Sequence, residues 1–229
     1  MTPQPLPPLP PEGCRISFVG KGGSGKSTTA GHVIAHWTAA GVPVTGFDAD
    51  DPGEDEKGSL SIWAGRVRGG LGAPIYPVPD PAHIAREARR LTPPHGIGLL
   101  DSGAWENRVG NRHYAVLAAA DLVALFLAPT PMETERGSSV RKAMAKMEAM
   151  GLTPPQLVIV LSMVHPTAAA AAETRQELVD SGLTVLTSEV PLSHGREGYA
   201  QSFNYSPRAI AGSPMDKLAR ELHAKVAAL

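Results

Sequence analysis

A glycine-rich segment between a strand-like and a helical stretch constrains the fold of this 229-residue chain more than any other feature. Residues 20–27 read Gly-Lys-Gly-Gly-Ser-Gly-Lys-Ser and fit the pattern GxxxxGK[ST], with an apolar stretch at 15–19 before them and a helix expected at 26–40. Glycines allow backbone conformations in which successive N–H groups point at a phosphate, and the helix N-terminus adds its positive end. The segment therefore predicts a site for a nucleoside triphosphate.

Two side chains at the end of this loop supply the chemistry that such a site needs. Lys26 can reach the β- and γ-phosphates, and the hydroxyl of Ser27 can ligate Mg²⁺. The residues expected to contact the nucleotide lie in the loop and the first helical turn: Gly22, Gly23, Ser24, Gly25, Lys26, Ser27 and Thr28. A glycine-rich turn that binds nothing is the alternative, and the strand before the loop and the helix after it argue against that alternative.

Strand-like and helical segments alternate along the rest of the chain. Further strands are expected at 42–47, 75–78, 97–100, 122–127, 157–163 and 183–190. Further helices are expected at 81–91, where Asp80 and Pro81 form a start signal, and at 107–120, 132–150, 167–181 and from about 214 onward. The segment 51–72, rich in glycine and charge, is expected to be a link. This alternation predicts an α/β fold: a single P-loop NTPase domain with a mainly parallel twisted sheet flanked by helices on both faces.

Proline dominates the N-terminal stretch, with six prolines among the first eleven residues. Because proline lacks a backbone N–H, this stretch favours an extended, polyproline-II-like conformation. We expect residues 1–13 to be a flexible, solvated tail and residues 14–229 to form the domain. A docking motif of the PxxP kind is the alternative, and nothing else in the sequence supports it.

Composition and charge exclude several classes of protein. The 21 lysines and arginines nearly balance the 22 acidic residues, so the chain is not a histone-like polycation. One cysteine, Cys14, excludes an intramolecular disulfide framework and an all-cysteine iron–sulfur site, and we expect it to be an inert thiol. His32 and His36 stand four apart without a third ligand, so no zinc site is expected. No apolar run reaches ~18–20 residues, which favours a cytoplasmic protein.

The loop also carries a second lysine, Lys21, at its start, and in this respect it resembles the deviant phosphate loop of the ParA/MinD ATPase family. Segment 58–64 and the pair Ser202-Phe203 are similar to small plasmid-type partition ATPases, and the resemblance extends over residues 15–229. It implies that ATP and Mg²⁺ are the cofactors. It also implies a homodimer that forms on ATP, in which Lys21 reaches the phosphates bound by the partner subunit.

Two acidic positions fit the same resemblance. Asp50 ends the stretch Phe47-Asp48-Ala49-Asp50, and the resemblance implies that its carboxylate orients the attacking water and approaches Mg²⁺. Asp101 follows an apolar strand and matches the aspartate that holds Mg²⁺ through water; a cap of the next turn is its structural alternative. The sequence departs from the family after both positions, with the acidic stretch 51–56 and with Ser102-Gly103-Ala104 where two prolines are common.

Met163 and Pro191 lie at the ends of later strands, where relatives line the adenine pocket, so the resemblance implies contact with the base. Both residue types are also common in cores and turns. The catalytic set implied by the resemblance is Lys21, Lys26 and Asp50, and the metal set is Ser27, Asp50 and Asp101.

The resemblance implies an ATP-driven DNA partition switch that segregates a plasmid or a chromosome. The ATP-bound dimer would bind DNA without sequence preference, and a centromere-binding ParB-like adaptor would stimulate hydrolysis and release. Basic residues near the C-terminus would meet the DNA phosphates: Arg196, Arg208, Lys217, Arg220 and Lys225. Such a protein would be cytoplasmic and nucleoid-associated.

The alternative is a MinD-like or cargo-positioning ATPase that acts at a membrane or on a protein assembly. Membrane-associated relatives usually end in an amphipathic helix with bulky apolar residues, whereas residues 218–229 combine leucines at helical spacing with much alanine and no aromatic residue. We therefore expect this helix to pack on its own domain, with no stable membrane association. The single cysteine also excludes an electron-transfer iron protein, whose cluster needs two cysteines from each subunit.

Overall fold

The structure is a computed structural model, and it describes residues 5–50, 58–105, 110–130, 137–165, 169–193 and 198–229. Within these ranges, seven strands form one parallel sheet in the order β3-β2-β4-β1-β5-β6-β7. The strands are β1 (Cys14–Gly20), β2 (Val44–Ala49), β3 (Ile75–Pro77), β4 (Ile97–Ser102), β5 (Leu122–Leu127), β6 (Gln156–Val164) and β7 (Val190–Pro191). The predicted α/β fold is confirmed.

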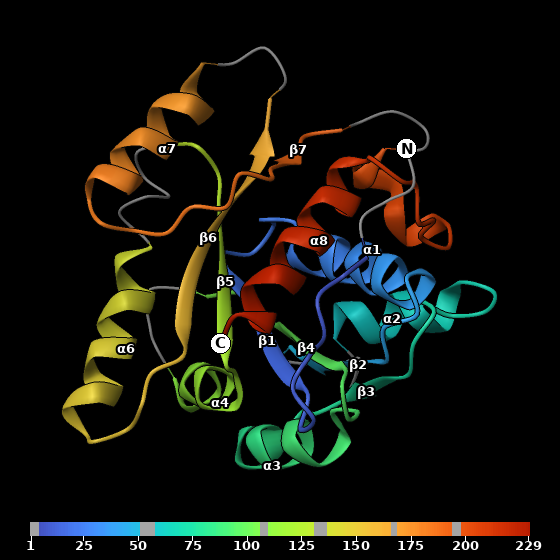
Figure 1. Cartoon of the computed structure of the whole chain (residues 1–229), viewed down its shortest axis with the longest axis horizontal. Coiled ribbons are helices and arrows are strands. Elements are labelled where there is room, and N and C mark those ends of the chain that lie inside the picture. The colour runs from blue at the N-terminus through green and yellow to red at the C-terminus, as the bar shows by residue number, and fades with distance from the viewer. Residues whose placement is uncertain (1–4, 51–57, 106–109, 131–136, 166–168, 194–197) are drawn as a thin grey trace.

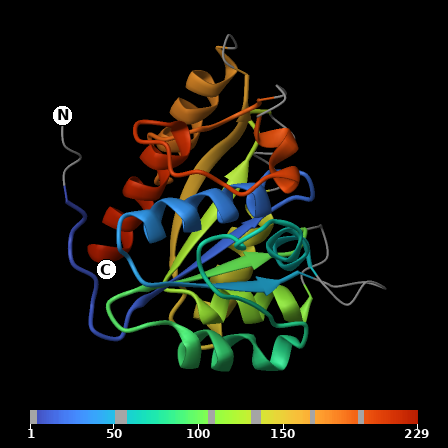
Figure 2. The same cartoon turned by 90° about the vertical axis from the view of Figure 1, so that its right-hand side faces the viewer.

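Helices cover both faces of this sheet (Figure 1). One face carries α1 (Lys26–Ala39), α2 (Ser59–Arg66), the short 3-10 helix η2 (Tyr199–Asn204) and α8 (Pro214–Ala227). The other face carries α3 (Pro81–Leu91), α4 (Asn111–Ala119), α6 (Ser138–Ala149) and α7 (Ala170–Asp180). Figure 2 shows α1 and α8 on the opposite side of the sheet from α3.

The strand β5 shows why the central strands are apolar throughout. Its even-numbered side chains enter the core below α1 and α8, and its odd-numbered side chains enter the core below α4 and α6. Every residue of the strand is buried. A parallel strand that is covered on both faces therefore needs a continuous apolar run.

Several predicted elements are confirmed nearly to the residue. The helix α3 begins at the predicted signal, since Asp80 accepts a hydrogen bond from the Ala82 N–H at 2.9 Å and Pro81 takes the first helical position. The helix α8 buries Leu218 and Leu222 against its own domain, as predicted. The predicted beginnings of three helices, at 107–109, 132–136 and 167–168, lie outside the described residues.

Two segments differ from the prediction. The predicted link 51–72 contains the helix α2, which is held at its N-terminus because the Ser61 N–H donates to Asp48 Oδ2 at 2.7 Å. The predicted strand 183–190 is wrong for most of its length: only a bridge at Val185 and the two residues of β7 pair with β6.

The side chain of Glu221, on α8, explains why that strand does not form. Its carboxylate accepts the N–H groups of Thr187 and Ser188 at 2.7 and 2.8 Å, which removes them from any ladder. Arg175, on α7, donates to the carbonyl oxygen of Leu186 in the same segment. Side chains therefore satisfy backbone groups that a continuous strand would have paired.

The N-terminal segment 5–13 also differs from the solvated tail that its prolines predict. Leu9 is 7% exposed and belongs to the core of α1 and α8. Nε2 of His223, on α8, lies 2.8 Å from the carbonyl oxygen of Pro7, and the His95 N–H donates to the carbonyl of Pro11. These contacts hold the segment along the domain.

Candidate functional site

The sequence-predicted site residues converge at the carboxyl edge of the parallel sheet. The phosphate loop follows β1, Asp50 follows β2, and Asp101 lies near the end of β4. Met163 and Pro191 lie at the same edge, at the ends of β6 and β7. Residues far apart in sequence meet there because parallel strands end together, and ligands bind at this edge in open α/β sheets.

The phosphate loop has the backbone that its glycines predict. Gly23 and Gly25 have φ values of 78° and 83°, in the left-handed region that other residues rarely adopt. Gly25 is also the N-cap of α1, and no side chain caps this helix or places an acidic group in its first turn. The N-terminus of α1 therefore presents amide groups and a positive dipole end toward the loop.

Lys26 folds back over this loop. Its Nζ donates to the carbonyl oxygens of Gly20 and Lys21 at 2.9 and 3.0 Å, and the side chain is 6% exposed. Burial lowers the pKa of Lys26, and the carboxylates of Asp101 and Asp50 oppose that change. The ammonium group is thus placed inside the ring of loop atoms, next to two acidic residues.

Asp101, near the end of β4, is fully buried. Among the residues that the structure describes, neither of its oxygens makes a hydrogen bond. Burial raises the pKa of Asp101 to about 7, and the nearby Ser27 hydroxyl opposes the rise without meeting hydrogen-bond geometry. A buried, unsatisfied carboxylate beside a hydroxyl is an oxygen donor set that fits Mg²⁺.

Asp48 lies near the end of β2 and Asp50 directly follows the strand, and their carboxylates make different contacts. Asp48 is 1% exposed, and besides the Ser61 amide it accepts the Asp50 N–H at 3.3 Å. Burial raises the pKa of Asp48, and the hydrogen bonds from Ser61 oppose this. Asp50 is half-buried, and its Oδ2 accepts the Ser59 hydroxyl at 3.4 Å. The acidic stretch 51–56 lies outside the described residues.

The two lysines of the loop differ in exposure. Lys21 is exposed at the outer side of the loop, whereas Lys26 is buried within it. Ser27 and Thr28 are partly buried in the first turn of α1. An exposed lysine at the start of the loop is compatible with a contact to a second subunit, and that role of Lys21 stays a prediction.

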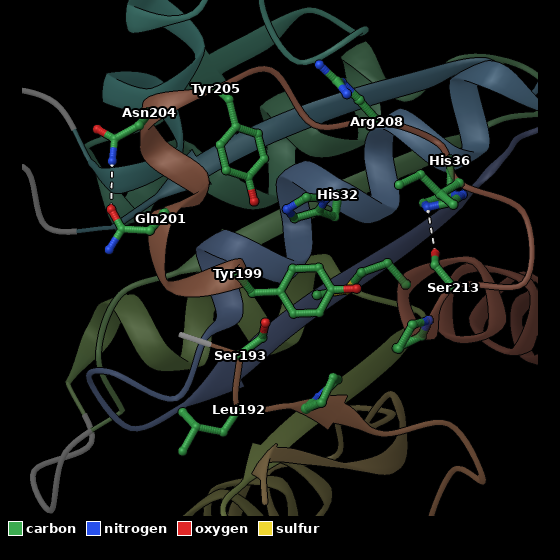
Figure 3. A pocket seen from close by; sticks show the side chains of 14 residues that line it. His32, His36, Leu192, Ser193, Tyr199, Gln201, Asn204, Tyr205, Arg208 and Ser213 are labelled. Carbon is green, nitrogen blue, oxygen red and sulfur yellow. Dashed lines mark hydrogen bonds between the residues drawn. The ribbon is translucent and has the colours of Figure 1, made fainter. Parts of the chain in front are cut away.

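Met163 and Pro191 lie close to α1. Met163 adopts a φ of 55°, and its Cε comes within 3.3 Å of the point where a side chain at Gly25 would begin. Pro191 is one of the residues that line a cavity of about 830 Å³, which also includes Leu192 and Ser193 (Figure 3). The structure thus places Met163 beside Gly25 of the phosphate loop, and Pro191 at a cavity that residues of α1 also line.

His32 and His36 line the same cavity, from α1. Nε2 of His32 lies 3.0 Å from the Ser202 hydroxyl, and the Tyr199 ring meets the His32 ring edge-on at 5.1 Å. Burial lowers the pKa of His32 to about 4, so the ring is neutral at pH 7. His36 lies 3.5 Å from Asp216. In the described part of the chain, no three His, Cys, Asp or Glu side chains cluster as metal ligands would.

Trp105 and Arg112 join the site although nothing in the sequence analysis singled them out. The main-chain N–H of Trp105 donates to the carbonyl oxygen of Gly20 at 2.9 Å, and the Trp105 ring packs on His113 at 4.4 Å between centroids. Arg112 donates to main-chain carbonyls at the end of β2. A tryptophan close after Asp101 was a usable signal, whereas Arg112 bonds to backbone groups about sixty residues away and leaves no local pattern.

The basic residues predicted to meet DNA do not share one environment. Arg208 is exposed beside the cavity and Lys217 is exposed on α8. Arg220 donates to Asp216 at 3.2 Å, which offsets part of its charge. Lys225 is partly buried near the end of α8, and Arg196 lies outside the described residues.

Cys14 is buried, and burial raises the pKa of its thiol to about 11. A thiol that stays protonated at neutral pH is a poor nucleophile. This agrees with the inert thiol that was predicted.

Comparison with known proteins finds one similar sequence and many similar folds. No protein-family model matches the chain. Protein ParA of Rhizobium radiobacter is 28% identical over 192 residues, which cover 81% of this chain and 79% of that protein. This relative supports the resemblance of the chain to the ParA/MinD family of P-loop ATPases that the phosphate loop indicates.

Solved structures of McdA and MinD proteins share the fold. The ATP complex of a substituted McdA from Cyanothece superposes with a TM-score of 0.64 at 13% identity, covering 94% of this chain and 96% of that chain. The septum site-determining protein MinD of Pyrococcus horikoshii OT3, complexed with Mg-ADP, gives a TM-score of 0.59 at 17% identity, covering 93% and 95%. At such low identity these structures support the ParA/MinD fold alone.

Proposed function

We propose that this chain is an ATP-hydrolysing DNA partition switch. In this proposal it binds ATP with Mg²⁺, closes as a homodimer, and binds DNA without sequence preference until hydrolysis resets it. The observation that carries the nucleotide part is the buried, unsatisfied carboxylate of Asp101 beside Ser27 and Lys26 at the phosphate loop. The sequence similarity to Protein ParA of Rhizobium radiobacter supports the partition part.

Residues of the loop and of the neighbouring strand ends would each have a separate role in hydrolysis. Mg²⁺ would be held by Ser27 and, through water, by Asp101, with Asp50 near it, and would neutralise charge that develops on the phosphates. Lys26 would move its ammonium group from the loop carbonyls toward the β- and γ-phosphates, where charge accumulates during transfer. Asp50 would accept a hydrogen bond from the attacking water and orient it.

The remaining contacts select the nucleotide and the assembly. Met163 and Pro191 would flank the adenine base, since Met163 lies against Gly25 of the loop and Pro191 lies at the same edge of the sheet, at the end of β7. Lys21, exposed at the start of the loop, would reach the phosphates of the partner subunit in the ATP dimer. A Lys21→Ala variant would then bind ATP but fail to dimerise in sedimentation, and an unchanged ATP dimer would contradict this contact.

The C-terminal helix favours DNA over a membrane as the surface on which the dimer acts. The apolar face of α8, including Leu218, Leu222 and Val226, is buried against its own domain. Across the described residues, no helix is both long and apolar enough to cross a bilayer. A centromere-binding ParB-like adaptor would stimulate hydrolysis, and the protein would be cytoplasmic and nucleoid-associated.

A binding experiment with an ATP-locked dimer separates this function from that of a MinD-like or cargo-positioning ATPase. Purified Asp50→Ala is mixed with two unrelated DNA duplexes or with anionic liposomes, in ATP or ADP. We expect similar binding to both duplexes, only with ATP, and a steep loss between ~50 and ~200 mM salt. Binding to liposomes but not to DNA at low salt would favour the membrane-positioning alternative.

A further inference from the structure

Arg112, at the start of α4, is bound to another part of the chain. Its Nη1 donates to the carbonyl oxygens of Ala49 and Asp50 at 3.3 and 3.2 Å, and its Nη2 donates to the carbonyl of Pro79 at 2.6 Å. The side chain is partly buried. One guanidinium group therefore joins α4 to the end of β2 and to the residue before Asp80.

The two carbonyls at the end of β2 lie on either side of the Asp50 Cα. Because each peptide group is planar, holding the carbonyl oxygens of Ala49 and Asp50 restrains both φ and ψ of Asp50. These two dihedrals set the direction in which the Asp50 side chain leaves the backbone. The carboxylate is also contacted at Oδ2 by the Ser59 hydroxyl.

Arg112 connects the two parts of the chain that carry Asp101 and Asp50. The helix α4 is the next helix after β4, the strand that contains Asp101, whereas β2 is the strand that precedes Asp50. A guanidinium group suits this link, since its planar fork reaches several acceptors at once. A lysine ammonium is a point charge on a single atom, and it would not span the carbonyls of β2 and of Pro79 together.

We propose that Arg112 is a positioning residue that holds the Asp50 carboxylate in the direction required to orient the attacking water; this rests on the ATPase function proposed above. Arg112 acts through the backbone of Asp50 and not through the nucleotide. Its loss therefore lowers the rate of hydrolysis and leaves the affinity for ATP nearly unchanged.

The test is a steady-state ATPase comparison of folded variants. The set is Arg112→Ala, Arg112→Met, Arg112→Lys, Asp50→Ala and the double variant Arg112→Ala/Asp50→Ala. Arg90→Ala is the matched control, since Arg90 is exposed on α3 and binds Glu87 of its own helix. We expect Arg112→Ala and Arg112→Met to lower kcat about tenfold or more with KM within about twofold, Arg112→Lys to be intermediate, and the control to be unchanged.

The double variant and chemical rescue distinguish positioning from a general structural role. Arg112→Ala should lower the rate no further once Asp50 is absent, and millimolar methylguanidinium should restore part of kcat to Arg112→Ala but not to Asp50→Ala. Unchanged kcat in folded Arg112→Ala, multiplying effects in the double variant, or unfolding of all three Arg112 variants would overturn the proposal. Wild-type turnover in Asp50→Ala would instead overturn the proposed role of Asp50 itself.

Discussion

Asp48 and Asp101 lie directly opposite each other on the neighbouring strands β2 and β4, yet only one of the two buried carboxylates is satisfied. Asp48 accepts the Ser61 amide at 2.7 Å and so holds the start of α2. Asp101 has no hydrogen bond among the described residues. A buried polar group without a partner destabilises a fold, so the carboxylate of Asp101 suits the Mg²⁺ site proposed above.

Replacing Asp101 with asparagine should separate stability from function. Without Mg²⁺ at pH 8, Asp101→Asn should raise the free energy of unfolding, because raising the carboxyl pKa from 3.8 to about 7 corresponds to an upper bound of ~4 kcal/mol for holding the charge. The same variant should lose Mg²⁺-dependent ATP hydrolysis. Urea unfolding and an ATPase assay measure the two effects. A variant that is less stable without Mg²⁺, or that hydrolyses ATP normally, would contradict this account of Asp101.

Acid should destabilise the protein through His32. The pKa of His32 is about 4 in the folded chain and 6.5 for the free side chain, so between these values the unfolded state binds a proton that the native state does not. Stability therefore falls as the pH drops from 6.5 toward 4, by up to ~3 kcal/mol from this group. His36 and His223, whose pKa values are also lowered by burial, act in the same direction.

The variant His32→Gln isolates this contribution, since glutamine can still bond the Ser202 hydroxyl but does not titrate. Urea unfolding at pH 7.5 and pH 5 should show a smaller loss of stability in His32→Gln than in the wild type. Equal losses in the two proteins would show that His32 is not the group responsible.

Gly31 should be intolerant of any side chain. A Cβ at this position would lie 2.1 Å from Cζ3 of Trp63, which is wholly buried between α1 and η2. Gly31→Ala should destabilise the fold by about 1–3 kcal/mol through overpacking. Gly65→Ala is the control, because nothing lies within 4 Å of its added Cβ; as a helical position it should gain up to ~1 kcal/mol. Thermal unfolding measures the melting temperatures of both variants. Equal shifts in Gly31→Ala and Gly65→Ala would contradict the packing argument.

The N-terminal segment should contribute to stability. Leu9 is buried in the core of α1 and α8, so Leu9→Ala should cost about 2 kcal/mol or more in the free energy of unfolding. Leu152→Ala, at a leucine that is 49% exposed, should cost much less. Chemical denaturation measures both, and a neutral Leu9→Ala would favour the solvated tail that the prolines predicted.

The elements that the sequence predicted well are those with local causes. The loop from Gly20 to Ser27 and the cap at Asp80 depend on residues within a few positions of one another, and the apolar run of β5 reflects burial on both faces. Such signals can be recognised in a single sequence because each is a contiguous run of residues, although the burial of β5 itself involves distant elements.

The features that were missed depend on distant partners. The helix α2 is short and surrounded by glycines, and it is held by Asp48 and by the packing of Trp63 on Phe203. The segment before β7 loses its ladder to Glu221 on α8. Arg112 contacts main-chain carbonyls, which any residue type could supply. None of these contacts can be recognised without the tertiary fold.

The central claim is that Lys26 and the phosphate loop form a site for Mg²⁺ and ATP. The most direct test is to titrate MgATP calorimetrically into the wild type, Lys26→Ala and a control, and to measure the ATPase turnover of the same three proteins. The control is Lys142→Ala, because Lys142 is exposed on α6. We expect Lys26→Ala to remain folded by circular dichroism while it loses MgATP binding or turnover by about a hundredfold or more, with the control unchanged. A folded Lys26→Ala protein that binds and hydrolyses ATP like the wild type would contradict the account.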